Sequence, residues 1–160
     1  MSDDRARRSL LRHTLATLAY RGAKAFRDAP PGFSDFRAAP GSRSAGEILA
    51  HIGDLLDWGL ALAGGQHKWR ESPVLPWTEA VTRFHAALER FDTALASDDG
   101  LGFSAEQLFQ GPIADALTHI GQVSMLRRLA VSPVKAENYF KAEITKGRVS
   151  QAQAPPNAEF

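Results

Sequence analysis

Three side chains, His51, Asp115 and His119, have the types and the spacing to hold a metal ion. Asp115 and His119 are four residues apart, which places both on one face of a helix about one turn apart. His51 lies three residues after Ile48 and four before Leu55, so a helix here turns its imidazole toward the same side as these apolar residues. Two imidazoles and one carboxylate leave coordination positions open for water or substrate, as catalytic metal sites do. We therefore predict a metal site at His51, Asp115 and His119.

Cysteine is absent from the chain, which excludes disulfide bonds and catalysis by a thiolate of the protein itself. A bound metal must then be held by nitrogen and oxygen ligands. Zinc, nickel, iron and manganese all accept such a set, so the predicted cofactor is a divalent metal ion of open identity. A structural reading also exists for each residue: His51 as a hydrogen-bonded core residue, and Asp115 as a helix-start carboxylate paired with His119.

Other polar residues near these positions also have two readings each. Glu47, four residues before His51, could be a fourth ligand or could orient the site, although a role in helix capping is favoured. Gln122 could hydrogen-bond a ligand or a bound water, or could bridge two helices. His85 and the glutamate four residues after it repeat the helical spacing, and we predict that they form a surface pair. Arg127-Arg128 could bind a substrate carboxylate, but an outer charged face is favoured.

Four segments carry apolar residues at helical spacing. They are residues 4–27, residues 44–64, residues 76–97 and residues 111–130. The second opens with the capping box Ser44-Ala45-Gly46-Glu47 and stops at Gly64-Gly65. The fourth is expected to begin at Gly111-Pro112, because proline is tolerated in a first helical turn. A separate short helical turn is considered over residues 103–107.

Four amphipathic helices bury their apolar stripes most simply as an all-α four-helix bundle. We predict a single domain over residues 1–160, with an irregular or short-helical tail from about residue 133. In the third helix the apolar residues step by three and four, which indicates a core-facing seam. They are Val81, Phe84, Leu88, Phe91 and Leu95. His51 and His119 each lie about seven residues into their predicted helices. If these two helices run parallel, the two side chains lie at the same height; if they run antiparallel, one helix must be offset along its axis for the side chains to meet.

The formal net charge of +1 gives no electrostatic reason to expect binding to nucleic acid or to an anionic membrane. No apolar run approaches the ~18–20 residues that a membrane span requires. The first residues lack the apolar core and cleavage site of a signal peptide. We expect a cytoplasmic protein.

The run Asp115-Ala116-Leu117-Thr118-His119-Ile120-Gly121-Gln122 resembles the late-helix motif of the DinB/YfiT-like superfamily, His-x-x-x-His-x-Gly-Gln. His51, within Ile48-Leu49-Ala50-His51-Ile52, sits where that superfamily has an earlier histidine on its second helix. The chain departs from the motif at Asp115, where many members have a histidine. Mycothiol-dependent maleylpyruvate isomerase, a related bundle enzyme, uses a carboxylate at the corresponding place.

This resemblance implies a four-helix bundle that holds a divalent metal and acts on small molecules. The implied chemistry is a thiol-dependent transferase or isomerase reaction, or a hydrolase reaction. The cosubstrate would be a low-molecular-weight thiol, which supplies the sulfur that the chain lacks. A homodimer is expected. The alternative is a non-catalytic homodimeric bundle, a binding or stress-response protein whose metal site has decayed. DNA binding is a third reading, and the near-neutral charge argues against it.

Overall fold

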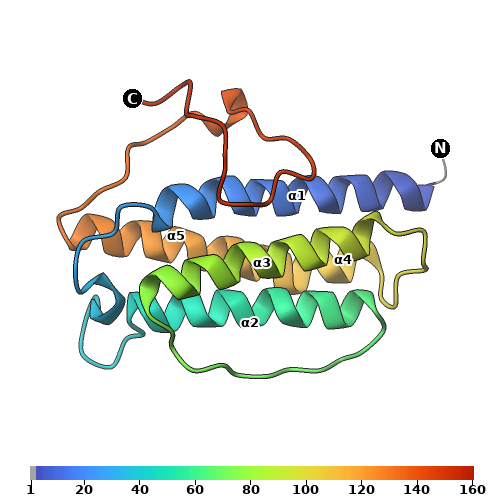
Figure 1. Cartoon of the computed structure of the whole chain (residues 1–160), viewed down its shortest axis with the longest axis horizontal. Coiled ribbons are helices and arrows are strands. Elements are labelled where there is room, and N and C mark those ends of the chain that lie inside the picture. Colours follow the sequence, from blue (N-terminus) through green and yellow to red (C-terminus); the bar gives the residue numbers. More distant parts are fainter. Residues whose placement is uncertain (1–2) are drawn as a thin grey trace.

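Helices dominate the computed structural model, which describes residues 3–160 and has no β-strand among them (Figure 1). The helices are α1 (Asp3–Phe26), α2 (Ala45–Ala63), α3 (Trp77–Ala96), α4 (Ala105–Leu108) and α5 (Ala114–Leu129). A π-helical turn, Phe109–Ile113, joins α4 to α5, and two 3-10 turns lie at Phe33–Asp35 and Tyr139–Lys141. The predicted all-α, four-helix-bundle fold class is confirmed. Within the described part of the chain, every helix is too short or too polar to cross a membrane.

The start of α2 is fixed by side-chain capping, as predicted. The hydroxyl of Ser44 accepts a hydrogen bond from the backbone N–H of Glu47 at 3.2 Å, and the Glu47 carboxylate accepts from the Ser44 N–H at 2.7 Å. These two bonds satisfy N–H groups that have no partner inside the helix. The capping reading of Glu47 is therefore confirmed, and Glu47 is also paired with Arg37 at 2.8 Å.

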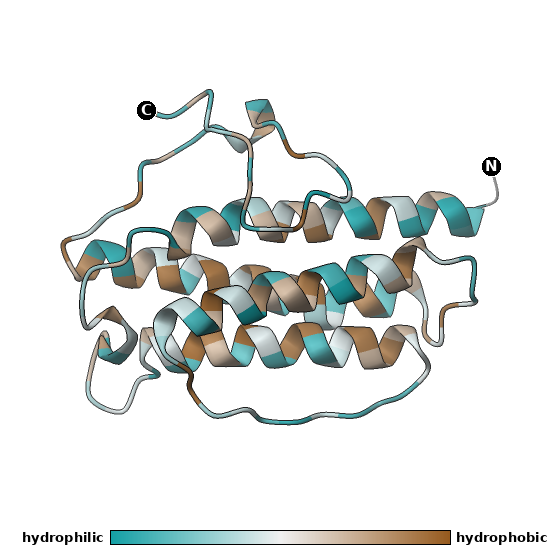
Figure 2. Ribbon diagram, viewed as in Figure 1, coloured by the Kyte–Doolittle hydropathy of each residue, from teal (hydrophilic) through white to brown (hydrophobic). Residues whose placement is uncertain are grey.

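The core forms where the apolar faces of the helices meet, and each long helix alternates hydrophobic and hydrophilic residues along its length (Figure 2). Phe84, Leu88, Phe91 and Leu95 of α3 are all buried, so the predicted seam is confirmed at these positions. The Phe84 ring meets that of Phe26 from α1 edge to face, with centroids 5.0 Å apart. Burial of such large side chains supplies most of the free energy that holds a bundle together.

The fourth helical segment begins earlier than the sequence predicted. Its first turn is capped at Ser104, whose hydroxyl accepts from the Gln107 N–H, and the chain stays helical from there to Leu129. Gly111-Pro112 lies inside the π turn instead of at a helix start. Proline has no N–H to donate, and a widened turn tolerates that missing bond better than a regular α-helical turn does. The prediction of a start at Gly111-Pro112 was wrong because residues 103–107 were considered as a separate turn, whereas the chain is continuously helical from the end of that stretch into α5.

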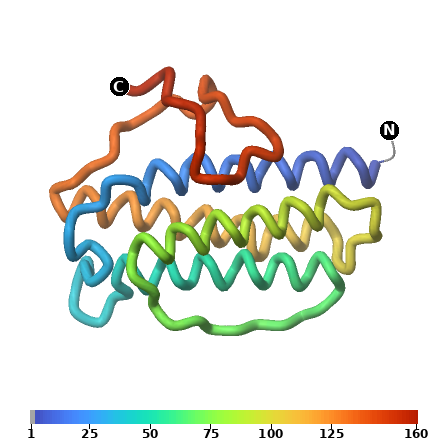
Figure 3. The backbone as a smooth tube through the Cα atoms, in the orientation of Figure 1, coloured from blue at the N-terminus to red at the C-terminus, as the bar shows by residue number. Residues whose placement is uncertain are grey.

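The segment after residue 133 has little regular structure, as predicted, but it packs on the bundle. It folds back along α1 (Figure 3), and the buried carboxylate of Glu137 accepts hydrogen bonds from Tyr20 at 2.6 Å and Lys24 at 2.7 Å. On α3, the Nδ1 of His85 donates to the carbonyl of Val149 at 2.9 Å. His85 is buried beneath this segment, so the prediction of a surface pair was wrong.

Arg127 is also buried, which corrects the expectation of an outer charged face. Its guanidinium donates to the carbonyls of Ala25 at 3.0 Å and Arg27 at 2.8 Å, where α1 ends. Terminal carbonyls of a helix have no intrahelical donor, and a cation also stabilises the negative end of the helix dipole. Arg127 therefore joins the end of α1 to α5, while its neighbour Arg128 is exposed.

Candidate metal centre

The site lies between α2 and α5, which pack against each other and run in opposite directions (Figure 1). The end of α2 is tied to the segment before α4 by a hydrogen bond from the Gly102 N–H to the Ala63 carbonyl at 2.9 Å. A side chain at Gly102 would overlap the backbone of Gly65, so the chain can approach this closely only with glycine there. This junction fixes the offset, along the helix axes, between α2 and the helical segment that contains α5.

The earlier start at Ala105 is what brings the two histidines level. His51 lies roughly three turns before the junction on α2, and His119 lies roughly four turns after it on the other segment. If the segment had begun at Gly111 as predicted, His119 would lie too close to the junction. One helix would then have to slide along its antiparallel partner to bring the two histidines together. The six additional helical residues place His119 within about one turn of the level of His51, and the two rings meet with centroids 4.7 Å apart.

The three predicted ligands converge. The Nε2 atom of His119 lies 3.4 Å from one oxygen of Asp115, and the Nε2 atom of His51 lies 3.8 Å from the other. One donor atom from each residue can be chosen so that all three lie within 4.8 Å of one another. The two imidazole planes are nearly perpendicular, with ring centroids 4.7 Å apart. The sequence therefore predicted the right three residues as a cluster that could hold a metal.

Gln122 determines which nitrogen of His119 is available. Its side-chain oxygen lies 2.7 Å from Nδ1 of His119. An amide oxygen can only accept, so Nδ1 donates its proton to Gln122, and Nε2 is the nitrogen that faces Asp115. A second residue that orients a histidine in this way is typical of metal sites. Of the two readings of Gln122, the structure favours a role within the site over an interhelical bridge.

The charge state of His51 suits ligation. Partial burial lowers the pKa of His51, and electrostatic repulsion from His119 and Arg43 lowers it further, against the attraction of Asp115 and Asp54. A lower pKa keeps the imidazole neutral near pH 7, which is the form that binds metals. Asp115 is about half exposed at 48%, so the cluster opens to solvent on its side.

Aromatic rings cover one side of the cluster. The Trp69 ring lies 5.6 Å from that of His51, and the Trp58 ring lies 5.9 Å from that of Trp69. Trp69 belongs to the link between α2 and α3, which runs beside α2 (Figure 1). The indole N–H of Trp58 is buried and has no acceptor among the described residues.

On the side toward the end of α5, a groove of about 450 Å³ begins at His119. One wall is the face of α5 that carries His119 and Gln122, and the other is the start of α2 with the loop before it. The lining residues are Ala38, Ser42, Arg43, Ile48, His119, Gln122, Met125, Leu126 and Leu129. Sequence reasoning missed this groove and Arg43, because the loop at residues 38–43 has no periodic pattern that would place it against α5.

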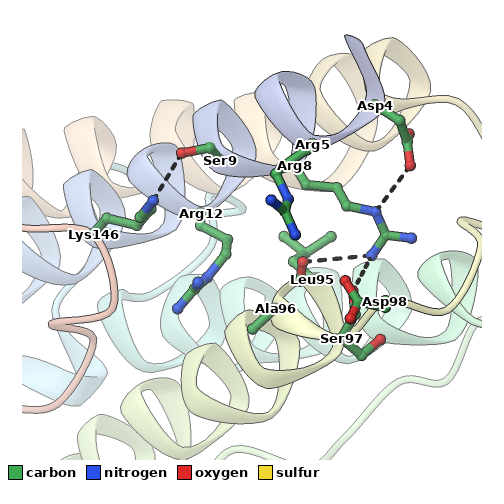
Figure 4. A pocket seen from close by; sticks show the side chains of 10 residues that line it. All are labelled: Asp4, Arg5, Arg8, Ser9, Arg12, Leu95, Ala96, Ser97, Asp98 and Lys146. Carbon is green, nitrogen blue, oxygen red and sulfur yellow. Dashed lines mark hydrogen bonds and ion pairs between the residues drawn. The ribbon is translucent and has the colours of Figure 1, made fainter. Parts of the chain in front are cut away.

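A second depression, of about 470 Å³, lies between α1 and the end of α3 (Figure 4). It is rich in basic residues, but these are engaged in structural contacts. Arg8 donates to the Ser97 carbonyl at 2.9 Å, where α3 ends, and Arg12 pairs with both oxygens of Asp92 at 2.9 and 2.8 Å. Lys146 donates to the hydroxyl of Ser9 at 2.9 Å and so holds the C-terminal segment on α1. This depression is explained by packing between helices.

Comparison of the whole chain with protein-family models, curated proteins and solved structures finds no match in any of the three. Function must therefore be inferred from the cluster and its surroundings.

Proposed function

We propose that the chain binds one divalent metal ion through His51, Asp115 and His119 and is a metal-dependent enzyme acting on a small molecule. The observation that carries this proposal is the convergence of three donor atoms, from two helices, within 4.8 Å of one another. A chance ion-pair cluster would not need Gln122 to direct the free nitrogen of His119 toward the carboxylate.

The spacing of these donors fits a metal after small side-chain movements. Metal–ligand bonds of about 2.0–2.2 Å place neighbouring ligands on one ion about 3.0–3.5 Å apart. The separation of 3.4 Å between His119 and Asp115 is already in that range, and the 3.8 Å between His51 and Asp115 is slightly longer. These two distances end at different oxygens of Asp115, so side-chain rotations would be needed to bring all three donors, now within 4.8 Å of one another, to one ion. Two neutral imidazoles and one carboxylate suit zinc, nickel, iron or manganese.

A bound metal supplies Lewis-acid chemistry, lowering the pKa of a coordinated thiol or water. Residues of the chain orient the ligands and control access to the metal position. Gln122 holds the imidazole of His119 in one tautomer, Trp69 shields His51 on one side, and the exposed face of Asp115 admits solvent and substrate. A thiol-dependent transferase or isomerase of the DinB type fits this arrangement. Its sulfur comes from a low-molecular-weight thiol, since the chain has no cysteine.

The direct test is metal analysis of protein purified without a polyhistidine tag, then titrated with Zn²⁺ after removal of bound metal. We expect one equivalent per chain in the wild type. His51→Ala and His119→Ala should each lose tight binding, and His13→Ala, which changes an exposed histidine on α1, should keep it. Stoichiometric binding that persists in both ligand variants would exclude this site.

The same experiment separates the enzyme from its alternative. In a non-catalytic bundle with a decayed site, the wild-type chain binds no Zn²⁺ with micromolar or better affinity, and His51→Ala changes stability equally with and without chelator.

A further inference from the structure

The groove that begins at His119 has an unusual combination of one cation and exposed apolar side chains. Met125 and Leu129 are 52% and 51% exposed, although their neighbour Leu126 is buried. His119, Gln122, Leu126 and Leu129 follow one another at three- and four-residue steps, so one face of α5 runs continuously from the metal cluster into this apolar surface. Ile48 of α2 lies on the opposite wall.

Arg43 supplies the charge in this groove. It is exposed, and none of residues 3–160 provides it with a hydrogen bond or an ion pair. The other arginines near helix ends are engaged: Arg8 and Arg127 hold backbone carbonyls, and Arg37 pairs with Glu47. A guanidinium presents several donors in a plane that matches a carboxylate or a phosphate. Arg43 is therefore placed to receive an anionic group from outside the chain.

We propose that this groove binds the substrate of the metal centre and that the substrate is an amphipathic acid, with an anionic group at Arg43 and an apolar body on Met125 and Leu129. That the bound acid is a substrate rests on the proposed metal function, but binding of the acid in the groove needs no metal. The occupant matches the charge of the groove: a purely apolar ligand would leave the guanidinium unused, and a polar one would leave the apolar wall in water.

The test uses metal-free protein, so that a carboxylate cannot bind through the metal. Octanoate, 1-octanol and octylammonium are titrated at low salt, and binding is located by NMR at the side-chain amide of Gln122. We expect octanoate to bind most tightly and octylammonium least. In the series from butanoate to octanoate, affinity should rise about two- to fourfold for each added CH₂, because each group leaves water for the apolar wall.

Two variants, each with a matched control, show whether binding depends on the charge of Arg43 and on the apolar side chain of Leu129. Arg43→Gln should weaken octanoate about fivefold and leave 1-octanol within twofold, whereas Arg128→Gln, an exposed arginine outside the groove, should change neither. Leu129→Ser should weaken both ligands, and Leu10→Ser, at an exposed leucine of α1, should weaken neither. Equal binding of all three ligands, or no effect of Arg43→Gln on octanoate, would overturn the inference.

The outcomes also separate this inference from the metal site. Octanoate binding with the expected variant effects, in a chain that takes up no Zn²⁺, supports an acid-binding groove and removes the metal function. One equivalent of Zn²⁺ without octanoate binding keeps the metal centre and overturns the groove. If the groove is instead covered by a second copy of the chain, octanoate fails to bind and Leu129→Ser shifts the protein from dimer to monomer, which also overturns it.

Discussion

The side-chain amide oxygen of Gln122 accepts a hydrogen bond from Nδ1 of His119, one turn away on the same helix, at 2.7 Å. This contact fixes the imidazole so that its other nitrogen faces Asp115, 3.4 Å away. The motif from Asp115 to Gln122 thus contains two proposed ligands, Asp115 and His119, and a residue that positions one of them.

Replacing Gln122 should weaken metal binding without unfolding the chain. We expect Gln122→Ala to lower Zn²⁺ affinity about 10- to 100-fold, because loss of an orienting hydrogen bond frees the ligand ring. Gln122→Glu keeps an acceptor and should retain affinity within about threefold. Competition titration against a chelator measures both. Equal loss in the two variants would show that Gln122 acts by another route.

Metal binding should stabilise the fold through Asp115. Zn²⁺ at about 100 times its dissociation constant adds about 2.7 kcal/mol to the free energy of unfolding, which raises the melting temperature by about 5–10 °C in a chain of this size. Asp115→Asn should abolish most of that rise and change the metal-free melting temperature by under about 2 °C, because its side chain is half exposed. Asp98→Asn, at an exposed aspartate after α3, should keep the full rise. A full rise in Asp115→Asn would remove Asp115 from the site.

Acid should destabilise the chain through His85. Burial lowers the pKa of His85, while the Val149 carbonyl and Glu89 act in the opposite direction. Histidine in the unfolded chain titrates near 6.5, so below about pH 6.5 the unfolded state takes up a proton that the folded state resists. The free energy of unfolding must then fall with decreasing pH, by up to about 1.4 kcal/mol per pH unit, until the folded pKa is reached.

Urea unfolding of metal-free protein at pH 7.5, 6.5 and 5.5 measures this effect. His85→Gln should be less stable at pH 7.5, since it loses packing and the bond to Val149, but should lose less stability on acidification than the wild type. His13→Gln should behave as the wild type. Identical pH dependence of wild type and His85→Gln would contradict the assignment.

Two helical glycines should respond to alanine with opposite signs. A Cβ at Gly59 would lie 2.5 Å from the buried ring of Phe91, and the ring has no free space to move into. Gly59→Ala should therefore cost about 1–3 kcal/mol of stability. At Gly121 nothing lies within 4 Å, so Gly121→Ala should stabilise by up to about 1 kcal/mol through helix propensity. Urea unfolding of both variants checks the pair.

Local sequence patterns were enough to predict the long helices, apart from the start of the last one, and the three residues of the candidate metal cluster. The capping box at Ser44 and the seam from Phe84 to Leu95 depend on contacts within a few residues, and both predictions were confirmed. His51, Asp115 and His119 were found because ligand spacing on a helix is periodic. Their convergence also needed α2 and α5 to be neighbours, which four amphipathic helices make common but do not require.

The start of the last helical segment was a local error, but the failed predictions for His85 and Arg127 concern contacts between segments far apart in sequence. His85 is buried because residues 133–160 fold over α3, and Arg127 is buried because α1 ends beside α5. Neither residue has a neighbour in sequence that reports this. The groove with Arg43 escaped for the same reason, since a loop without periodicity supplies one of its walls.

The π turn at Phe109–Ile113 fixes the rotation of α5 about its axis, and this rotation orients both the candidate metal centre and the buried face of the helix. One residue fewer in that turn would rotate everything after it by about 100° relative to the helix before it. Ala116 and Ile120, now buried, would swing out together with Asp115 and His119. A length change at this point would therefore disrupt the candidate metal cluster and the packing of the core together, because one rotation moves both.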